Sequence, residues 1–129
     1  MGGALETATR TLFDNLDRKD AEAIIRTVAD DVQAVDEISR QWLRGADALG
    51  AYFRQAMEMV DGIQSTINNV HESIHGDAGL LTCWLEQDYT LEGERTHVSA
   101  PTTLAFRREG NEWKVILIHT VPLAPPQDS

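Results

Sequence analysis

The stretch Trp113-Lys-Val-Ile-Leu-Ile-His-Thr-Val121 is expected to decide the fold, because β-branched and apolar side chains occupy both of its alternating faces. A strand that is apolar on both faces has to be covered on both. Residues 97–108 before it are rich in Thr, Val, Leu and Phe, and Gly110-Asn111 between the two runs is typical of a two-residue hairpin turn. Counting outward from that turn predicts these pairs: Trp113 with Arg108, Val115 with Phe106, Leu117 with Leu104, and His119 with Thr102.

Length and charge restrict the class of protein. The 129 residues are expected to form a single domain, residues 1–129, in which 122–129 is a loose tail. Asp and Glu number 21 against 11 Lys and Arg, and the net charge of −10 argues against nucleic-acid binding and against contact with an anionic membrane. No run of about 18 apolar residues and no signal-peptide pattern near Met1 is seen, so we expect a cytoplasmic protein. Cys83 has no second cysteine to pair with and is expected to be a small buried residue.

The hydrophobic period changes once along the chain. Apolar residues recur at helical spacing in residues 5–16, 24–28 and 49–60, and Asp20 is placed to cap the second of these helices. A short strand at residues 32–36 precedes the third helix. From Ile63 onward the period is two, and turns at 76–79, 92–94 and 110–111 divide the remainder into four long strands. This order predicts an α+β fold with three helices on one side of a bent antiparallel sheet.

Five motifs follow one another along the chain: Phe13-Asp-Asn-Leu-Asp-Arg-Lys-Asp20, Ala29-Asp-Asp-Val32, Arg44-Gly45, Gly76-Asp77 and Thr103-Leu-Ala-Phe-Arg-Arg-Glu-Gly-Asn-Glu-Trp113. In this order they resemble the nuclear-transport-factor-2-like superfamily, and most of all its SnoaL-like and kinase-association-domain-like branches, over about residues 5–122. The resemblance implies a cone-shaped cystatin-like fold, in which three N-terminal helices pack on a strongly curved antiparallel sheet and enclose a pocket. Most members are homodimers. Some are enzymes, such as ketosteroid isomerase, scytalone dehydratase and polyketide cyclases, and others only bind or assemble.

The predicted sheet has two faces, and two assignments of them are open. A polar face carries Thr82, Trp84, Glu86, Asp88, Ser99, Pro101, Thr103, Ile116, Ile118 and Thr120. An aliphatic face carries Leu81, Cys83, Leu85, Tyr89, Leu91, Val98, Leu104, Phe106, Val115, Leu117 and His119. Hydrophobicity alone places the aliphatic face under the helices. The resemblance favours the reverse, with the polar face lining the pocket and the aliphatic face forming a homodimer interface, and we adopt it as the working expectation. A single bulge would exchange the faces locally.

Asp36 is the candidate catalytic residue. The segment from Ala29 to Asp36 matches, in its spacing, the segment that carries the general-base aspartate of ketosteroid isomerases, and a carboxylate in an apolar pocket can shuttle a proton between carbons. That reaction also needs donors for the enolate oxygen. The resemblance puts Leu12 and Thr103 at the two donor positions, which argues against a true ketosteroid isomerase. The alternative for Asp36 is a solvated carboxylate at the end of a strand.

The segment His71-Glu-Ser-Ile-His75 spells the H-E-x-x-H zinc-protease motif. That chemistry needs a helix, whereas this segment has strand period and is followed by Gly76. On a strand the two histidines would lie about 13 Å apart, too far for one ion, so no metal site is predicted. We expect His71 at the rim of the pocket, beside Trp84.

The remaining candidates are ligand contacts. Glu86 and Asp88 would be paired carboxylates for a cationic or hydroxylated ligand if they point inward, and a solvated stripe if they point outward. His119 resembles a histidine frequent at this place in the superfamily and is expected at a dimer contact. Thr120 replaces the arginine of the association-domain branch, so the pocket should lack that branch's anion-binding character. The predicted ligand-binding set is Trp42, Tyr52, Phe53, His71, Trp84, Glu86, Asp88, Thr103, Ile116, Ile118 and Thr120.

Two functional hypotheses follow. The first is a homodimeric protein of the SnoaL-like type that binds a small hydrophobic molecule without a cofactor, and whose carboxylates, led by Asp36, would supply acid–base chemistry for an isomerase, cyclase or dehydratase. The second is a non-catalytic dimeric association module whose pocket is vestigial. The residues leave open whether the protein is an enzyme.

Overall fold

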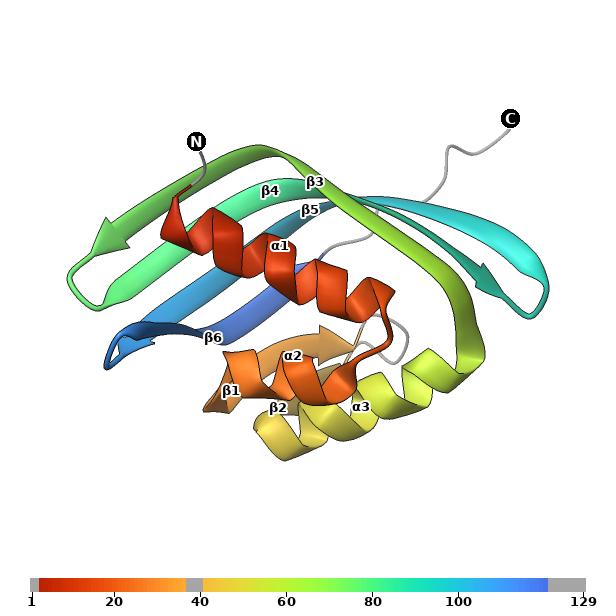
Figure 1. Ribbon diagram of the computed structural model, residues 1–129, viewed down its shortest axis with the longest axis horizontal. Helices are drawn as coiled ribbons and strands as arrows, with labels where there is room; N and C mark the ends of the chain where they lie inside the picture. Colours follow the sequence, from red (N-terminus) through yellow and green to blue (C-terminus); the bar gives the residue numbers. More distant parts are fainter. Residues whose placement is uncertain (1–2, 37–40, 121–129) are drawn as a thin grey trace.

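The computed structural model describes residues 3–36 and 41–120, which form three helices and six strands. The helices are α1 (Ala4–Asp17), α2 (Ala21–Thr27) and α3 (Ala46–Met59). The strands are β1 (Val28–Asp36), β2 (Gln41–Arg44), β3 (Val60–His75), β4 (Ala78–Leu91), β5 (Glu94–Glu109) and β6 (Glu112–Thr120). They form one sheet in the order β2-β1-β6-β5-β4-β3, antiparallel throughout except for the parallel pair β1 and β6. The sheet curves around the helices, which all lie on its concave side (Figure 1).

The predicted α+β class and the curved sheet under three helices are confirmed, but the first two strands differ from the prediction. The predicted strand at 32–36 begins four residues earlier, at Val28. Asp30 and Asp31 are exposed within it, and an irregularity in its pairing with β6 breaks the alternation that sequence reasoning relies on. The edge strand β2 was not predicted, because its four residues are too few and too exposed to show a strand pattern. None of the helices in the described ranges is long and apolar enough to cross a membrane.

Aspartate side chains form hydrogen bonds at the start of α2 and at the end of α1. Asp20 caps α2 as predicted, since its Oδ1 accepts a hydrogen bond of 3.1 Å from the N–H of Ala23. At the other end of the preceding helix, the Asp17 carboxylate accepts hydrogen bonds from both the N–H and the hydroxyl of Ser65, at 2.9 and 2.7 Å. The last turn of α1 is therefore fastened to β3.

The aliphatic face of the sheet lies under the helices, so the face assignment favoured by the resemblance is wrong for β4 and β5. One buried cluster joins the aliphatic face to α1, and it contains Leu5, Leu12, Phe13, Leu81, Cys83, Leu85, Leu104, Phe106 and Val115. The apolar stripe of α1 requires an apolar counterpart, and carboxylates placed there would lose their hydration. A face buried within one chain cannot be a dimer interface. The predicted interface is therefore also wrong.

A bulge in the last hairpin exchanges the faces of β6. Near the turn the pairs are as predicted, Arg108 with Trp113 and Phe106 with Val115. Beyond them Ile116 is the extra residue, so Leu117 pairs with Ala105 instead of Leu104, and His119 pairs with Thr103 instead of Thr102. Leu117 and His119 consequently move to the outer face. Ile118 and Thr120 turn toward the helices.

Candidate functional site

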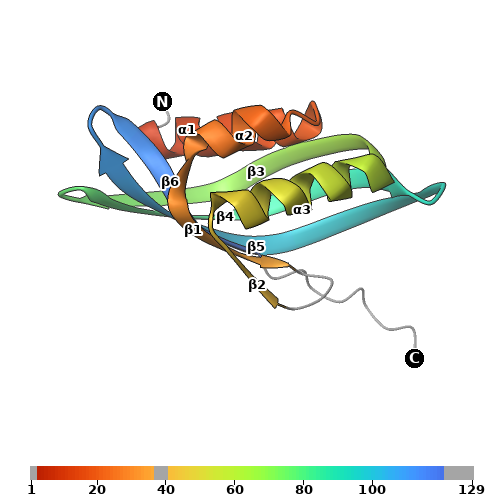
Figure 2. The same ribbon diagram turned by 90° about the horizontal axis from the view of Figure 1, so that it is seen from below.

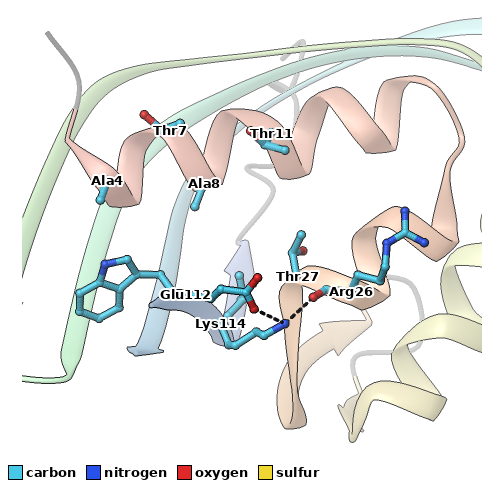
Figure 3. Close-up of a pocket in the computed structure, with 10 residues that line it drawn as sticks. Ala4, Thr7, Ala8, Thr11, Arg26, Thr27, Glu112 and Lys114 are labelled. Atoms are coloured by element: carbon cyan, nitrogen blue, oxygen red, sulfur yellow. Dashed lines mark hydrogen bonds and ion pairs between the residues drawn. The ribbon is translucent and has the colours of Figure 1, made fainter. Parts of the chain in front are cut away.

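A groove of about 300 Å³ runs between α1 and the beginning of β6 (Figure 3). One wall is the face of α1 that carries Ala4, Thr7, Ala8 and Thr11. The opposite wall consists of Arg26 and Thr27 at the end of α2, and of Glu112, Trp113, Lys114 and Val115 on β6. The volume is at the lower end of the range for small-molecule sites.

The groove exists because β1 joins β6 late. The first pair between these strands is Val28 with Val115, so residues 112–114 pair with β5 on one side and with no described strand on the other. α1 crosses above that edge with small side chains only, which leaves space beneath it (Figure 3). The Trp113 indole supplies an apolar wall, and the Arg108 guanidinium lies 5.6 Å from the centre of its ring.

Several polar groups of the groove already form hydrogen bonds within the protein. The Lys114 ammonium donates a 2.7 Å hydrogen bond to the carbonyl oxygen of Arg26 and lies 3.3 Å from the Glu112 carboxylate (Figure 3). The hydroxyls of Thr7 and Thr27 donate to backbone carbonyls, so they can only accept from a ligand. An ammonium has three donor positions, and Lys114 therefore has one left for an oxygen acceptor in the groove.

Most of the predicted polar ligand residues lie on the outer face of the sheet. His71, Trp84, Glu86, Asp88 and Thr103 share that face, as the alternation and the strand register require. No helix of the described residues covers it (Figure 2). These side chains therefore lie outside the groove. The expectation that His71 lies directly beside Trp84 is wrong. His71 pairs with Thr82, two residues before Trp84 on β4, and the partner of Trp84 is Asn68.

Glu86 and Asp88 hold a polar group, but it belongs to the chain itself, since it is the imidazole of His97. The Nδ1 of His97 lies 2.8 Å from Asp88 Oδ1, and its Nε2 lies 2.9 Å from Glu86 Oε2. The Ser99 hydroxyl donates to the other oxygen of Glu86 at 2.8 Å. Hydrogen bonds to Asp88 and then Glu86 raise the pKa of His97. The position that sequence reasoning gave to a cationic ligand is filled by this imidazole.

The other predicted site residues are dispersed. Tyr52 and Phe53 are half-buried on α3, with their rings edge to face at 5.7 Å. On β6, Ile116 is the bulge residue, Ile118 packs against the main core, and the Thr120 hydroxyl lies 3.3 Å from that of buried Thr102.

Two predicted residues lie near the open edge of the sheet. Trp42 on β2 is 49% exposed, with its ring 6.1 Å from that of His119. Asp36 is the last residue of β1 and pairs with Gln41, but its side chain lies outside the described part of the structure. Within residues 3–36 and 41–120 no group of three His, Cys, Asp or Glu side chains is arranged to hold a metal ion.

Sequence reasoning missed the groove, although a signal for it was available. Ala4, Thr7, Ala8 and Thr11 follow one another at spacings of three, one and three residues, which places small side chains along one face of α1. The wall on β6 had no such signal, because Lys114 and Trp113 were assigned only to strand pairing.

Comparison with known proteins gives a consistent picture of the fold. The model of the SnoaL-like domain matches residues 5–124. A candidate dehydratase of the NTF2-like family from Streptomyces avermitilis superposes with a TM-score of 0.85 at 21% identity, covering 95% of this chain and 96% of that one. A ketosteroid isomerase-like protein from Erwinia carotovora atroseptica has a TM-score of 0.81 at 21% identity, with 95% of each chain covered.

An NTF2-like protein with a cystatin-like fold from Novosphingobium aromaticivorans has a TM-score of 0.77 at 17% identity, covering 93% of this chain and 80% of that one. No curated protein sequence matches the chain. At these identities the solved structures support the fold and carry no information about the ligand.

Proposed function

The chain belongs to the SnoaL-like family of the nuclear-transport-factor-2-like superfamily, and from that premise we propose that it binds a small, mostly apolar molecule in the groove between α1 and β6. The observation that carries the proposal is the groove itself. It combines a volume of about 300 Å³ with an indole wall and a lysine that has a donor position left. Sites for small molecules commonly pair an apolar lining with a few polar groups that orient the ligand.

The ligand chemistry follows from the donors and acceptors of the groove. Trp113, Val115 and the alanines of α1 offer apolar contact for a ring or a short chain. Lys114 and Arg26 are the cationic side chains that line the groove, and either can orient an oxygen acceptor such as a carbonyl or carboxylate. We assign this contact to Lys114, whose ammonium is held at the groove by the carbonyl oxygen of Arg26. The ligand is therefore a compact hydrophobic molecule that carries one oxygen function.

Thermal unfolding with small probes tests this site. We expect 2-naphthoate to stabilise the protein, by about 2.7 kcal/mol at a concentration one hundred times its dissociation constant. 1-Naphthylmethylamine, which has the same rings and a positive charge, should stabilise it less. Thr11→Trp fills the groove and should abolish the effect, and Lys114→Met should weaken naphthoate binding about tenfold by removing a charge-assisted hydrogen bond.

Gln55→Trp is the matched control, since Gln55 is exposed on α3 and does not line the groove. It should keep the response of the unaltered protein. Naphthoate stabilisation that survives in Thr11→Trp, or its absence in the unaltered protein, would contradict the proposal.

Acid–base catalysis is a separate part of the proposal: the resemblance to ketosteroid isomerases assigns it to Asp36, at a site distinct from the groove. Asp36 ends β1 whereas the groove lies beside the start of that strand, about 25 Å away at ~3.3 Å per residue. Asp36→Asn should therefore leave naphthoate binding unchanged. The exchange of the α-protons of 2-tetralone for deuterium should be faster with the unaltered protein than with Asp36→Asn, and equal rates would remove Asp36 from the proposal.

A second candidate function is association with a copy of the same chain, as expected for a homodimer of this superfamily. The observation that favours it is the outer face of the sheet, which no described helix covers and on which Leu80 is 46% exposed (Figure 2). Trp84 and Leu117 lie half-buried on the same face. We therefore propose the outer face, and not the aliphatic face, as the dimer contact.

A further inference from the structure

The groove between α1 and β6 is locally positive in a protein whose net charge is −10. Among the described residues that line it, Arg26 and Lys114 are cations and Glu112 is the one acid. The remaining lining residues are alanines, threonines, a tryptophan and a valine, which carry no charge. A ligand in the groove therefore meets an excess of positive charge, which favours an anion over a neutral molecule of the same shape.

The charge of Lys114 is incompletely compensated within the protein. Its shorter contact, at 2.7 Å, is with the carbonyl oxygen of Arg26, which carries no net charge. Its acidic partner Glu112 lies 3.3 Å away with a side chain that is 72% exposed, whereas the lysine side chain is 22% exposed. An ion pair with so exposed a carboxylate is weak, because water solvates the acid and screens the attraction. A carboxylate inside the groove would meet the ammonium between apolar walls, where opposite charges attract more strongly.

The two arginines that pair with this part of β6 already have acidic partners. Arg107 forms ion pairs with two acids, at 3.0 and 2.6 Å, and Arg108 forms one, at 3.0 Å. Neither of them lines the groove. The guanidinium of Arg26 points away from the Lys114 ammonium (Figure 3), so Arg26 adds positive charge without sharing the same contact. Lys114 is therefore the residue that would contact an anion.

The number of donors left in the groove indicates which class of anion fits. Lys114 keeps one donor position, while the hydroxyls of Thr7 and Thr27 already donate to backbone carbonyls. A phosphate ester brings three acceptor oxygens and a charge of about −1.5 to −2. One donor position and one excess positive charge do not satisfy that group. A carboxylate, with two oxygens and a single charge, matches the groove better.

We propose that the groove selects a carboxylate on a compact apolar body, that Lys114 determines this specificity, and that Glu112 lowers the affinity by competing for the same ammonium. The inference rests on the proposed function of the groove and adds the charge class of its ligand. Glu112 presents a carboxylate of its own at 3.3 Å from Lys114, so an incoming carboxylate meets a like charge there. Removing that acid strengthens anion binding and leaves the apolar walls in place.

Isothermal titration calorimetry with three probes of one ring system tests the selection: 2-naphthoate, its neutral amide 2-naphthamide, and 2-naphthyl phosphate. At neutral pH and low salt we expect naphthoate to bind about tenfold more tightly than the amide, which presents the same carbonyl oxygen without the charge. The phosphate should bind no more tightly than naphthoate. Raising the salt concentration from about 0.05 to about 0.5 M should reduce the preference for naphthoate over the amide, since salt screens partly exposed charges.

Three variants assign the effect to residues. Lys114→Met should bind naphthoate and the amide with equal affinity, whereas Lys114→Arg keeps the positive charge and should keep the preference. Glu112→Gln should bind naphthoate about threefold more tightly and leave the affinity for the amide unchanged. Glu94→Gln is the matched control, because it removes one negative charge at the start of β5, outside the groove, and should change neither affinity.

The failure of this inference is distinguishable from failure of the proposed function. Equal affinities of the unaltered protein for naphthoate and the amide, or a preference that survives in Lys114→Met, overturn anion selection and leave the groove as a binding site. Tighter binding of the phosphate overturns the assignment to carboxylates, and an unchanged naphthoate affinity in Glu112→Gln overturns the role of Glu112. If none of the three probes binds, the inference and the proposed function both fall.

Discussion

Glu72 caps the first turn of α1, because its Oε1 accepts a 3.1 Å hydrogen bond from the backbone N–H of Glu6, 66 residues earlier in the chain. The residue at the N-cap position of α1 is Gly3, which has no side chain to accept this bond. Gly3 lies directly against the Glu72 carboxylate, where a larger residue would displace it. The negative charge also suits the positive end of the helix dipole. Glu72, the acid of the H-E-x-x-H string, thus joins β3 to α1.

The first prediction concerns this cap. Glu72→Ala should lower the free energy of unfolding by about 1 kcal/mol, because the N–H of Glu6 loses its partner. Chemical denaturation measures the change. Glu94 is an exposed acid at the start of β5, away from the first turn of any helix, so Glu94→Ala should cost clearly less. Equal losses in the two variants would show that the cap contributes nothing specific.

The second prediction tests which face of the sheet forms the core. Leu104 is fully buried beneath the helices, so Leu104→Ala should lower the free energy of unfolding by about 2–5 kcal/mol through lost burial and the cavity left behind. Leu80 is 46% exposed on the opposite face, and Leu80→Ala should cost about 0.5 kcal/mol or less in the monomer. Urea denaturation at low protein concentration compares the two. The reverse order would restore the face assignment that the resemblance favoured.

The third prediction concerns the titration of His97. Its pKa is raised in the folded protein by the hydrogen bonds to Asp88 and Glu86, so its stabilising contribution is fully present below the ordinary histidine pKa of about 6.5. That contribution is lost as the pH rises through the folded-state pKa. Nuclear magnetic resonance of the ring protons should give a pKa for His97 above the ordinary histidine value of about 6.5. Asp88→Asn and Glu86→Gln should each lower the pKa of His97. An unchanged pKa in both variants would show that the two carboxylates do not raise it.

The fourth prediction concerns Cys83. Burial raises the pKa of its thiol to about 11, so very little thiolate is present at about pH 8. Reaction with Ellman's reagent should therefore be slow in the native protein and rapid once guanidinium chloride unfolds it. Rapid reaction of the native protein would mean that β4 opens easily beneath α1. The sequence-based expectation of a small buried cysteine is confirmed by its 5% exposure.

Local patterns were sufficient for much of this fold. The helical spacing of Leu5, Leu12 and Phe13 identified α1, and Asp20 marked the start of α2. The turn at Gly110 and the pairs next to it were also predicted correctly, since a two-residue turn fixes the register of the residues beside it. Such features depend on neighbours within a few residues, and those neighbours are visible along the chain.

Features made by distant residues could not be read in this way. The bulge at Ile116 exchanges the faces of β6, which both covers the core and pairs with β1. These two contacts involve residues far away in the chain, so the residues of β6 alone do not predict the bulge. Likewise, nothing in the order of residues placed His97 between Glu86 and Asp88, since that contact depends on the register of two strands.

The amino-acid order thus determined the elements, their succession and the SnoaL-like fold, because period, caps and turns are local properties of a chain. Packing decided which side of the sheet meets the helices, where the groove opens and which carboxylates find a partner. Those outcomes follow from burying the most apolar surface that the whole chain can bring together, and that quantity exists only once the chain has folded.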